Sequence, residues 1–258
     1  MVLLALLILA VVVSDGYRRR WRWVLALARW WRGIRGPLWS WLRTAPVTNA
    51  YLVLLVFTTW LLLATSPGLR AEFLKAQSTN LHQLSVNPVP VLMRSAFYVT
   101  PLELVIWLVT FTLVLAPLER WVGSVRWLVA FWTGHIGATL VTAVGIWWAI
   151  RSGQATPDVA FMIDVGASYG FATLLGLTSY WFTGRLRWLW SLGFLAMWVT
   201  VMIVDPEITG AGHLVAYLLG LALYPMVKRL PPRAPVMPPG LRTRRADDQA
   251  ARGTGQAT

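Results

Sequence analysis

Two apolar stretches, LELVIWLVTFTLVLAPL (residues 102–118) and WLVAFWTGHIGATLVTAVGIWWAI (residues 127–150), flank a short segment that carries Glu119, Arg120 and Arg126. A helix needs about 20 apolar residues to cross a bilayer, and both stretches approach or exceed that length. Four more segments of this kind occur in the chain: residues 47–66, 161–183, 188–204 and 209–227. The pattern predicts an all-α fold, a polytopic membrane protein with a bundle of six transmembrane helices.

The composition agrees with a membrane protein. The 258 residues are 57% apolar and only 13% charged, whereas water-soluble domains carry roughly 25% charged residues. The chain has no cysteine, which excludes disulfides and thiolate metal sites. It also lacks the His-Glu-x-x-His pattern of zinc proteases. We therefore expect no metal and no cofactor.

The basic residues are distributed unequally between the two sides of the membrane. When the six segments are threaded alternately, nineteen of the 23 Lys and Arg residues fall on the side that carries both termini. Basic residues concentrate on the cytoplasmic side of membrane proteins. This distribution predicts a multi-pass protein of a bacterial cytoplasmic membrane with both termini in the cytoplasm.

Three regions are expected along the chain: residues 1–45, residues 46–229 with the six helices, and residues 230–258, a polar, proline-containing tail that we expect to be disordered. Residues 1–13 are apolar, and we interpret them as an interfacial or extra hydrophobic segment; a signal sequence or a seventh span is the alternative. Residues 17–44 combine eight arginines with six tryptophans. Beside a transmembrane segment this composition favours binding of anionic lipid headgroups, and we expect no nucleic acid partner.

Ionisable residues at membrane depth are candidate functional residues, because burying them in lipid is costly. Ser168 and His213 fall at similar predicted depths, about 10 Å and 6 Å below the outer end of their segments. Small residues at Gly212, Ala216 and Gly220 would let a neighbouring helix approach closely. We therefore predict that the Ser168 hydroxyl and the His213 imidazole lie about 2.6 to 3.2 Å apart, where the imidazole could activate the serine as a nucleophile.

These residues stand in short motifs that resemble those of the rhomboid family of intramembrane serine proteases. The family's Gly-x-Ser motif is similar to Gly166-Ala167-Ser168, which Gly170 follows. The family's motif on the sixth helix is similar to the set of His213, Ala216 and Gly220. Its Glu-x-x-x-Gly signature is similar to Glu119 and Gly123, and residues 94–97 resemble the approach to the second helix. The resemblance covers roughly residues 46–230. It implies Ser168 as nucleophile, His213 as base, structural roles for the signature residues, and transmembrane proteins as substrates.

Several positions depart from that family's usual pattern. Tyr98, Glu103 and Trp107 occupy the places of a His-x4-His-x3-Asn motif, whose second His and Asn help to hold the oxyanion. Tyr169 replaces the usual Gly after the nucleophile, and Ala172 replaces an aromatic residue often found four positions after it. None of the three replacements at 98, 103 and 107 reproduces the amide donor, so Asn80 in the outer loop becomes a candidate donor.

Other polar residues have more ordinary interpretations. Asp164 could orient His213, although a carboxylate there more often faces water or a loop amide. His135 is expected to form a hydrogen bond between packed helices. Two functions therefore remain open: an intramembrane serine endopeptidase that cuts near the outer membrane surface, and a non-catalytic relative, a pseudoprotease, that binds transmembrane helices of client proteins.

Overall fold

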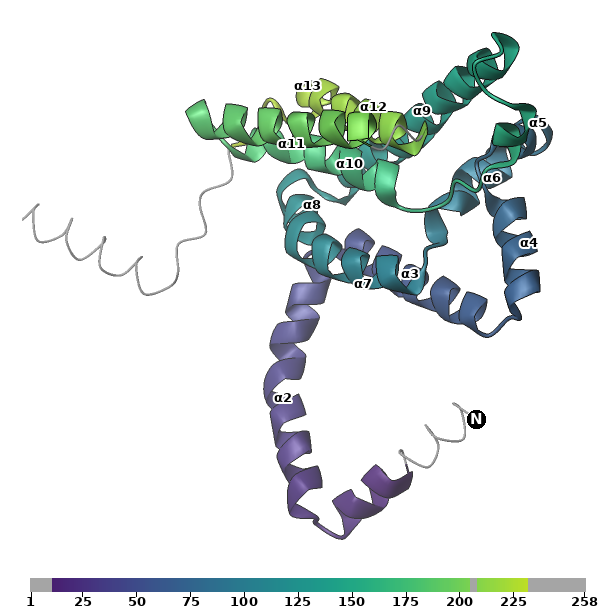
Figure 1. Cartoon of the computed structure of the whole chain (residues 1–258). Coiled ribbons are helices and arrows are strands. Elements are labelled where there is room, and N and C mark those ends of the chain that lie inside the picture. The colour runs from purple at the N-terminus through teal and green to yellow at the C-terminus, as the bar shows by residue number, and fades with distance from the viewer. Residues whose placement is uncertain (1–10, 205–207, 232–258) are drawn as a thin grey trace, which may run out of the picture.

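The computed structural model describes residues 11–204 and 208–231, which form an all-α bundle (Figure 1). The predictions for residues 1–10 and for residues 232–258 of the tail lie outside the described residues. Residues 11–18, which include the end of the first apolar segment, are helical.

Six helical segments overlap the six predicted apolar segments and make up the bundle. They are α3 (Pro46–Leu63), α7 (Pro101–Thr110) with α8 (Ala116–Val122), α9 (Ser124–Arg151), α10 (Ser168–Thr178), α11 (Gly184–Val204) and α12 (Ile208–Ala222). A π-helical turn, η2 (Phe111–Leu115), joins α7 to α8. Pro117 has no N–H for the usual bond to residue 113, and a widened turn accommodates that loss.

Among the described residues, four helices are long and apolar enough to cross a membrane: Pro46–Leu63, Pro101–Val122, Ser124–Arg151 and Gly184–Val204. Helix α12 is apolar but shorter. Helix α10 lies in the interior of the bundle, with residues 169, 170 and 172–178 all buried. Because protein surrounds α10, its ends need not reach the membrane surface.

Helix α10 is therefore shorter than the predicted segment of residues 161–183. The 3₁₀ turn η3 (Pro157–Phe161) and an irregular stretch precede it. Ser168 is the first residue of α10, whereas the sequence predicted it in the second turn of a helix. Gly166 explains part of the irregularity, because its φ of +135° is a backbone conformation that favours glycine. The prediction of a regular helix between residue 161 and Ser168 is therefore wrong, and the depth of about 10 Å that was derived from it stays untested.

Glu119 joins three helices at the opposite end of the bundle. Its carboxylate accepts hydrogen bonds from the backbone N–H groups of Val47 (3.0 Å) and Thr48 (2.8 Å) and from the Ser124 hydroxyl (2.6 Å). The first two belong to the first turn of α3, where helical N–H groups lack partners. Gly123, with φ of +84°, then lets the chain turn between α8 and α9.

Shorter helices connect the core. On the side where α10 begins, α4 (Pro67–Gln77), α5 (Leu81–Val86), α6 (Pro88–Arg94) and the 3₁₀ turn η1 (Ser95–Phe97) lead from α3 to α7. On the other side, η4 (Ser179–Trp181) leads into α11, and α13 (Tyr224–Val227) follows α12.

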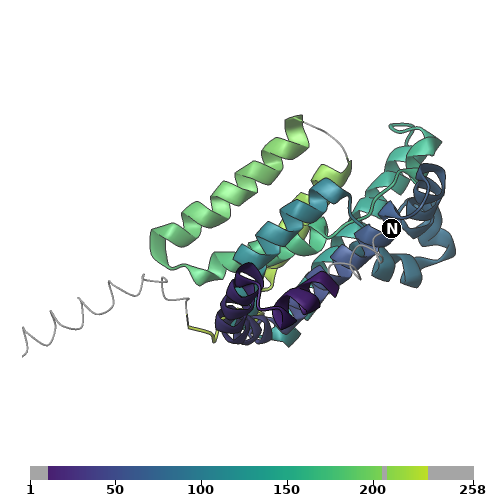
Figure 2. The ribbon, with the colours of Figure 1, turned by 90° about the horizontal axis from the view of Figure 1, so that it is seen from below.

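Helix α2 (Arg22–Arg43) projects from the bundle as an arm and meets it only near its C-terminal end (Figures 1 and 2). There the Arg120 side chain donates to the Thr44 hydroxyl (2.6 Å) and lies over the Trp41 ring (5.0 Å). Along the arm, large aromatic side chains are exposed, namely Trp21, Trp23, Trp30, Trp31 and Trp39. An amphipathic helix of this composition fits the membrane interface.

Candidate active site at the start of helix α10

Ser168 is the first residue of α10 and is partly exposed. The residue before it, Ala167, has no side chain that could cap the helix. Among the described residues, the backbone N–H groups of Ser168, Tyr169 and Gly170 have no hydrogen-bond partner, and the first helical bond runs from Phe171 N–H to the Ala167 carbonyl (2.9 Å). A helix N-terminus with free N–H groups attracts negative charge.

The stretch before Ser168 is held by two connecting segments. Asp164 N–H donates to the Ser78 hydroxyl (2.7 Å), and Thr79 N–H donates to the Asp164 carbonyl (2.9 Å). Gly166 N–H donates to the Ser95 carbonyl (2.9 Å). These bonds fix the turn that carries Ser168, so its position does not depend on α10 alone.

Helices α10 and α12 are in close contact. A Cβ atom on Gly176 would lie 2.5 Å from the Tyr217 carbonyl oxygen, and one on Gly220 would overlap the Thr173 carbonyl oxygen. The Thr173 hydroxyl donates to the Ala216 carbonyl (2.7 Å), and Ala216 is fully buried. The small residues therefore line the side of α12 that meets α10.

His213 lies on α12 beside the residue that follows Ser168. Its imidazole stacks flat on the Trp198 ring of α11, with ring centroids 4.8 Å apart and planes 8° apart. The Tyr169 ring meets it edge-on, with centroids 5.1 Å apart and planes 68° apart. Among the described residues no hydrogen bond joins the Ser168 hydroxyl to His213, so the direct contact between them stays a prediction.

No hydrogen bond joins Asp164 to His213 among the described residues. Its carboxylate accepts hydrogen bonds from the Thr79 hydroxyl (3.1 Å) and the Tyr169 hydroxyl (3.5 Å). Burial raises the pKa of Asp164, and the two hydrogen bonds oppose that rise. The carboxylate is thus shared between the connecting segment before α5 and Tyr169, and a role of Asp164 in orienting His213 stays a prediction.

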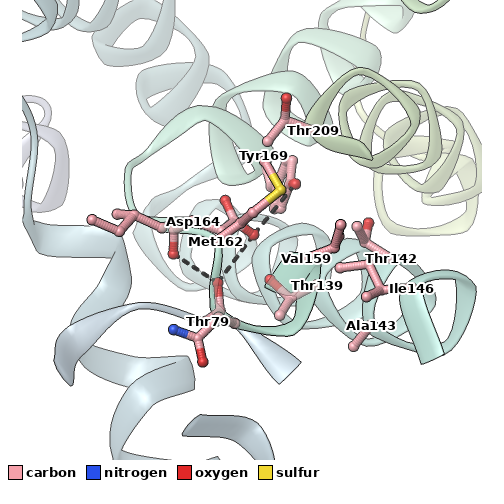
Figure 3. A pocket seen from close by; sticks show the side chains of 12 residues that line it. Thr79, Thr139, Thr142, Ala143, Ile146, Val159, Met162, Asp164, Tyr169 and Thr209 are labelled. Atoms are coloured by element: carbon pink, nitrogen blue, oxygen red, sulfur yellow. Dashed lines mark hydrogen bonds between the residues drawn. The ribbon is translucent and has the colours of Figure 1, made fainter. Parts of the chain in front are cut away.

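A small cavity adjoins Asp164 and Tyr169. Its volume is about 30 Å³, enough for a water molecule. Figure 3 shows the polar groups that point toward it, among them Thr139 from α9 and Thr79 from the connecting segment. The Thr139 hydroxyl is buried without a hydrogen-bond partner.

Glu103, at a position of the family's oxyanion motif, and Asn80, the candidate donor, both have other hydrogen bonds. Glu103 accepts from the Thr100 N–H (2.7 Å) and its own N–H donates to the Thr100 hydroxyl (3.3 Å), a capping box that starts α7. Asn80 caps α5 by accepting from Gln83 N–H (2.8 Å), and it lines the cavity. Neither side chain contacts Ser168.

Trp107 packs against Phe171 with ring centroids 5.2 Å apart, and its indole N–H is buried without a partner. Phe171 lies three residues after Ser168 and so on the same face of α10. Trp107 therefore carries an unpaired N–H donor and packs on this side of the helix. The sequence analysis considered only that Trp107 replaces the Asn of the family motif.

A second Ser–His pair lies deeper in the bundle. The Ser95 hydroxyl and His135 Nε2 are 3.0 Å apart, and the two side chains are 0% and 2% exposed. The prediction of an interhelical hydrogen bond for His135 is thus confirmed, although its partner comes from η1 rather than from a long helix. Burial closes this pair to a protein substrate.

Sequence reasoning missed Trp198, because nothing in the sequence of α11 sets this aromatic apart from its lipid-facing neighbours. It also missed the hydrogen bonds of Ser78 and Thr79 to Asp164, which have no sequence motif. Among the described residues, no group of three His, Asp or Glu side chains could hold a metal ion.

A family model described as rhomboid-like protein matches residues 40–232. No curated protein and no solved structure matches the chain. The matched residues include every core helix and the turn that carries Ser168.

We predict that Gly220→Ala destabilises the protein by about 1 to 3 kcal/mol, because the new methyl group collides with backbone rather than with a movable side chain. Thermal unfolding in detergent measures the effect. Gly193→Ala on α11 is the matched control, since nothing lies within 4 Å of its added Cβ. Equal melting temperatures for the two variants would contradict the close contact of α10 and α12.

Proposed function

Because the chain belongs to the rhomboid-like protein family, we propose that it is an intramembrane serine endopeptidase with Ser168 as nucleophile and His213 as general base. One observation carries this proposal: the His213 ring lies against the Tyr169 ring, and Tyr169 directly follows Ser168. Consecutive Cα atoms are 3.8 Å apart, so Ser168 lies one residue from a side chain that contacts the proposed base.

The proposed reaction follows the usual order of acyl transfer. The Ser168 oxygen attacks the carbonyl carbon of a substrate peptide bond while His213 takes the hydroxyl proton. The negative oxygen that forms is stabilised by the unpaired N–H groups at the start of α10. His213 then gives the proton to the leaving nitrogen, and water hydrolyses the acyl-enzyme by the same steps.

We expect the protein in proteoliposomes to cleave a single-span membrane substrate, and Ser168→Ala and His213→Ala each to reduce cleavage by at least about a thousand-fold. The double variant should lose no more than either single one, because the two residues act as a unit. His82→Ala, an exposed histidine, is the control and should keep full activity. Equal cleavage by wild type and Ser168→Ala would refute the mechanism.

The alternative function is binding of transmembrane helices without cleavage. The observation that favours it is that Ser168 and His213 share no hydrogen bond among the described residues. Two results together would support the alternative. The wild type would cleave no substrate, and the Ser168→Ala variant would keep its co-purifying membrane partners and its cellular effect.

We propose that both termini lie in the cytoplasm of a bacterial cell. The chain has no cysteine, so single cysteines report the topology cleanly. A membrane-impermeant thiol reagent should label Ser152→Cys, after α9, in intact cells, and Thr183→Cys, before α11, only after the membrane is broken. The reverse pattern would overturn the proposed orientation.

We also propose that α2 binds anionic lipid headgroups. Arg29 and Arg32 are exposed on the arm, and within the part of the chain that the structure describes their side chains donate only to carbonyls of their own helix, Leu25 (3.4 Å) and Ala28 (3.2 Å). Each arginine near an anionic surface contributes about 1 kcal/mol.

Replacing Arg29 and Arg32 together by Gln should weaken binding of phosphatidylglycerol roughly ten- to thirty-fold in native mass spectrometry, with phosphatidylcholine unaffected. Arg151→Gln, outside the arm, provides the control. Unchanged phosphatidylglycerol binding in the arm variant would contradict a headgroup site on α2.

A further inference from the structure

We propose that Trp198 is a positioning residue for His213, which it holds in a clamp of two aromatic rings completed by Tyr169. This inference rests on the proposed protease function. The clamp is formed by side chains from three helices, α10, α11 and α12, around the imidazole.

The geometry fixes the imidazole in two directions. The indole of Trp198 covers one face of the ring at 4.8 Å with the planes almost parallel. Tyr169 meets His213 at 68°, which restricts rotation within the plane that Trp198 defines. The backbone of Thr209, one turn earlier on α12, hydrogen-bonds the imidazole as well.

The surrounding small residues make the clamp possible. Ala172 and Ala216 are both 0% exposed and form a buried cluster with Tyr169, against which Trp198 packs. Two of the residues in the cluster that Trp198 contacts are therefore alanines. Gly212 has no side chain either, and a Cβ atom there would lie 2.5 Å from the Tyr169 ring. The replacements at positions 169 and 172 thus belong to one arrangement.

Helix α11 otherwise packs little against the bundle. Of its described side chains only Ser191 is buried, and exposed apolar residues cover most of the helix. Trp198 is an exception that reaches inward to His213. The indole therefore connects the proposed base to a helix that mainly faces lipid.

A flat indole beside the base has a chemical consequence. When His213 takes the Ser168 proton it becomes an imidazolium, and the face of an indole attracts a cation, most strongly where water is excluded. Trp198 should thus stabilise the charged state that forms during acylation, while contributing little to binding of the uncharged substrate. The expected effect lies in kcat rather than in KM.

The test measures cleavage kinetics of the full-length protein in proteoliposomes. Trp198→Leu should lower kcat about ten- to thirty-fold with KM unchanged, and Trp198→Phe should recover part of the loss because it restores a flat ring. Fluorinated tryptophans placed at residue 198 should lower kcat stepwise with each added fluorine, since fluorine weakens the attraction of the ring for a cation without changing its shape much. Trp188, on the same helix, is exposed, and the same substitutions there should leave kcat unchanged.

The possible outcomes separate the two proposals. An active wild type whose kcat is insensitive to Trp198→Leu and to fluorination would overturn the clamp alone. A second outcome is a lower kcat in Trp198→Leu with equal rates for all fluorinated tryptophans. This outcome would overturn stabilisation of the imidazolium by the indole, and with it the proposed role of Trp198. A folded wild type without any cleavage would overturn the protease function and the clamp with it.

Discussion

The close contact between α10 and α12 is the constraint on which the site depends. Lipid tails are as apolar as the side chains of a membrane helix, so there is no hydrophobic driving force for two helices to associate. Helices in a membrane associate instead through close packing and hydrogen bonds. Here the contact consists of Gly176 against the backbone of α12 and of Gly220 against the backbone of α10, with the Thr173 hydroxyl bonded to the Ala216 carbonyl. Ser168 stands at the head of one of these helices and His213 on the other, so their separation is set by residues one to three turns away.

The rest of the molecule holds that pair of helices in place. Helix α9 packs beside both, and a Cβ atom on its Gly134 would overlap the Thr173 side chain. Glu119 ties α3 to α8 and α9 through three hydrogen bonds at one end of the bundle. At the other end, Ser78, Thr79 and Ser95 hold the turn before Ser168. The buried helix α10 is therefore held at its start by the connecting segments and along its length by α9 and α12.

Much of this arrangement could be predicted from the sequence, because it follows from local patterns. Apolar length located the core helices, and the four-residue spacing of Gly212, Ala216 and Gly220 indicated the face that meets another helix. The length of α10 could not be predicted this way, since an apolar run does not distinguish a helix in lipid from one surrounded by protein. The hydrogen-bond partners of Glu103 and Asp164 could not be predicted either. The Glu103 carboxylate bonds to the N-cap residue of its own helix, and the Asp164 carboxylate bonds to a connecting segment that is distant in sequence. The contact of Trp198 with His213 was the hardest to foresee, because it joins side chains of two different helices and has no local sequence pattern.

The central claim is that Ser168 is a nucleophile activated by His213, and covalent labelling tests it most directly. The folded protein in detergent would be treated with a fluorophosphonate, digested and mapped by mass spectrometry. The account predicts an adduct on Ser168 in the wild type and none in His213→Ala. A folded wild type that carries no adduct, or carries it on a different serine such as Ser95, would contradict it.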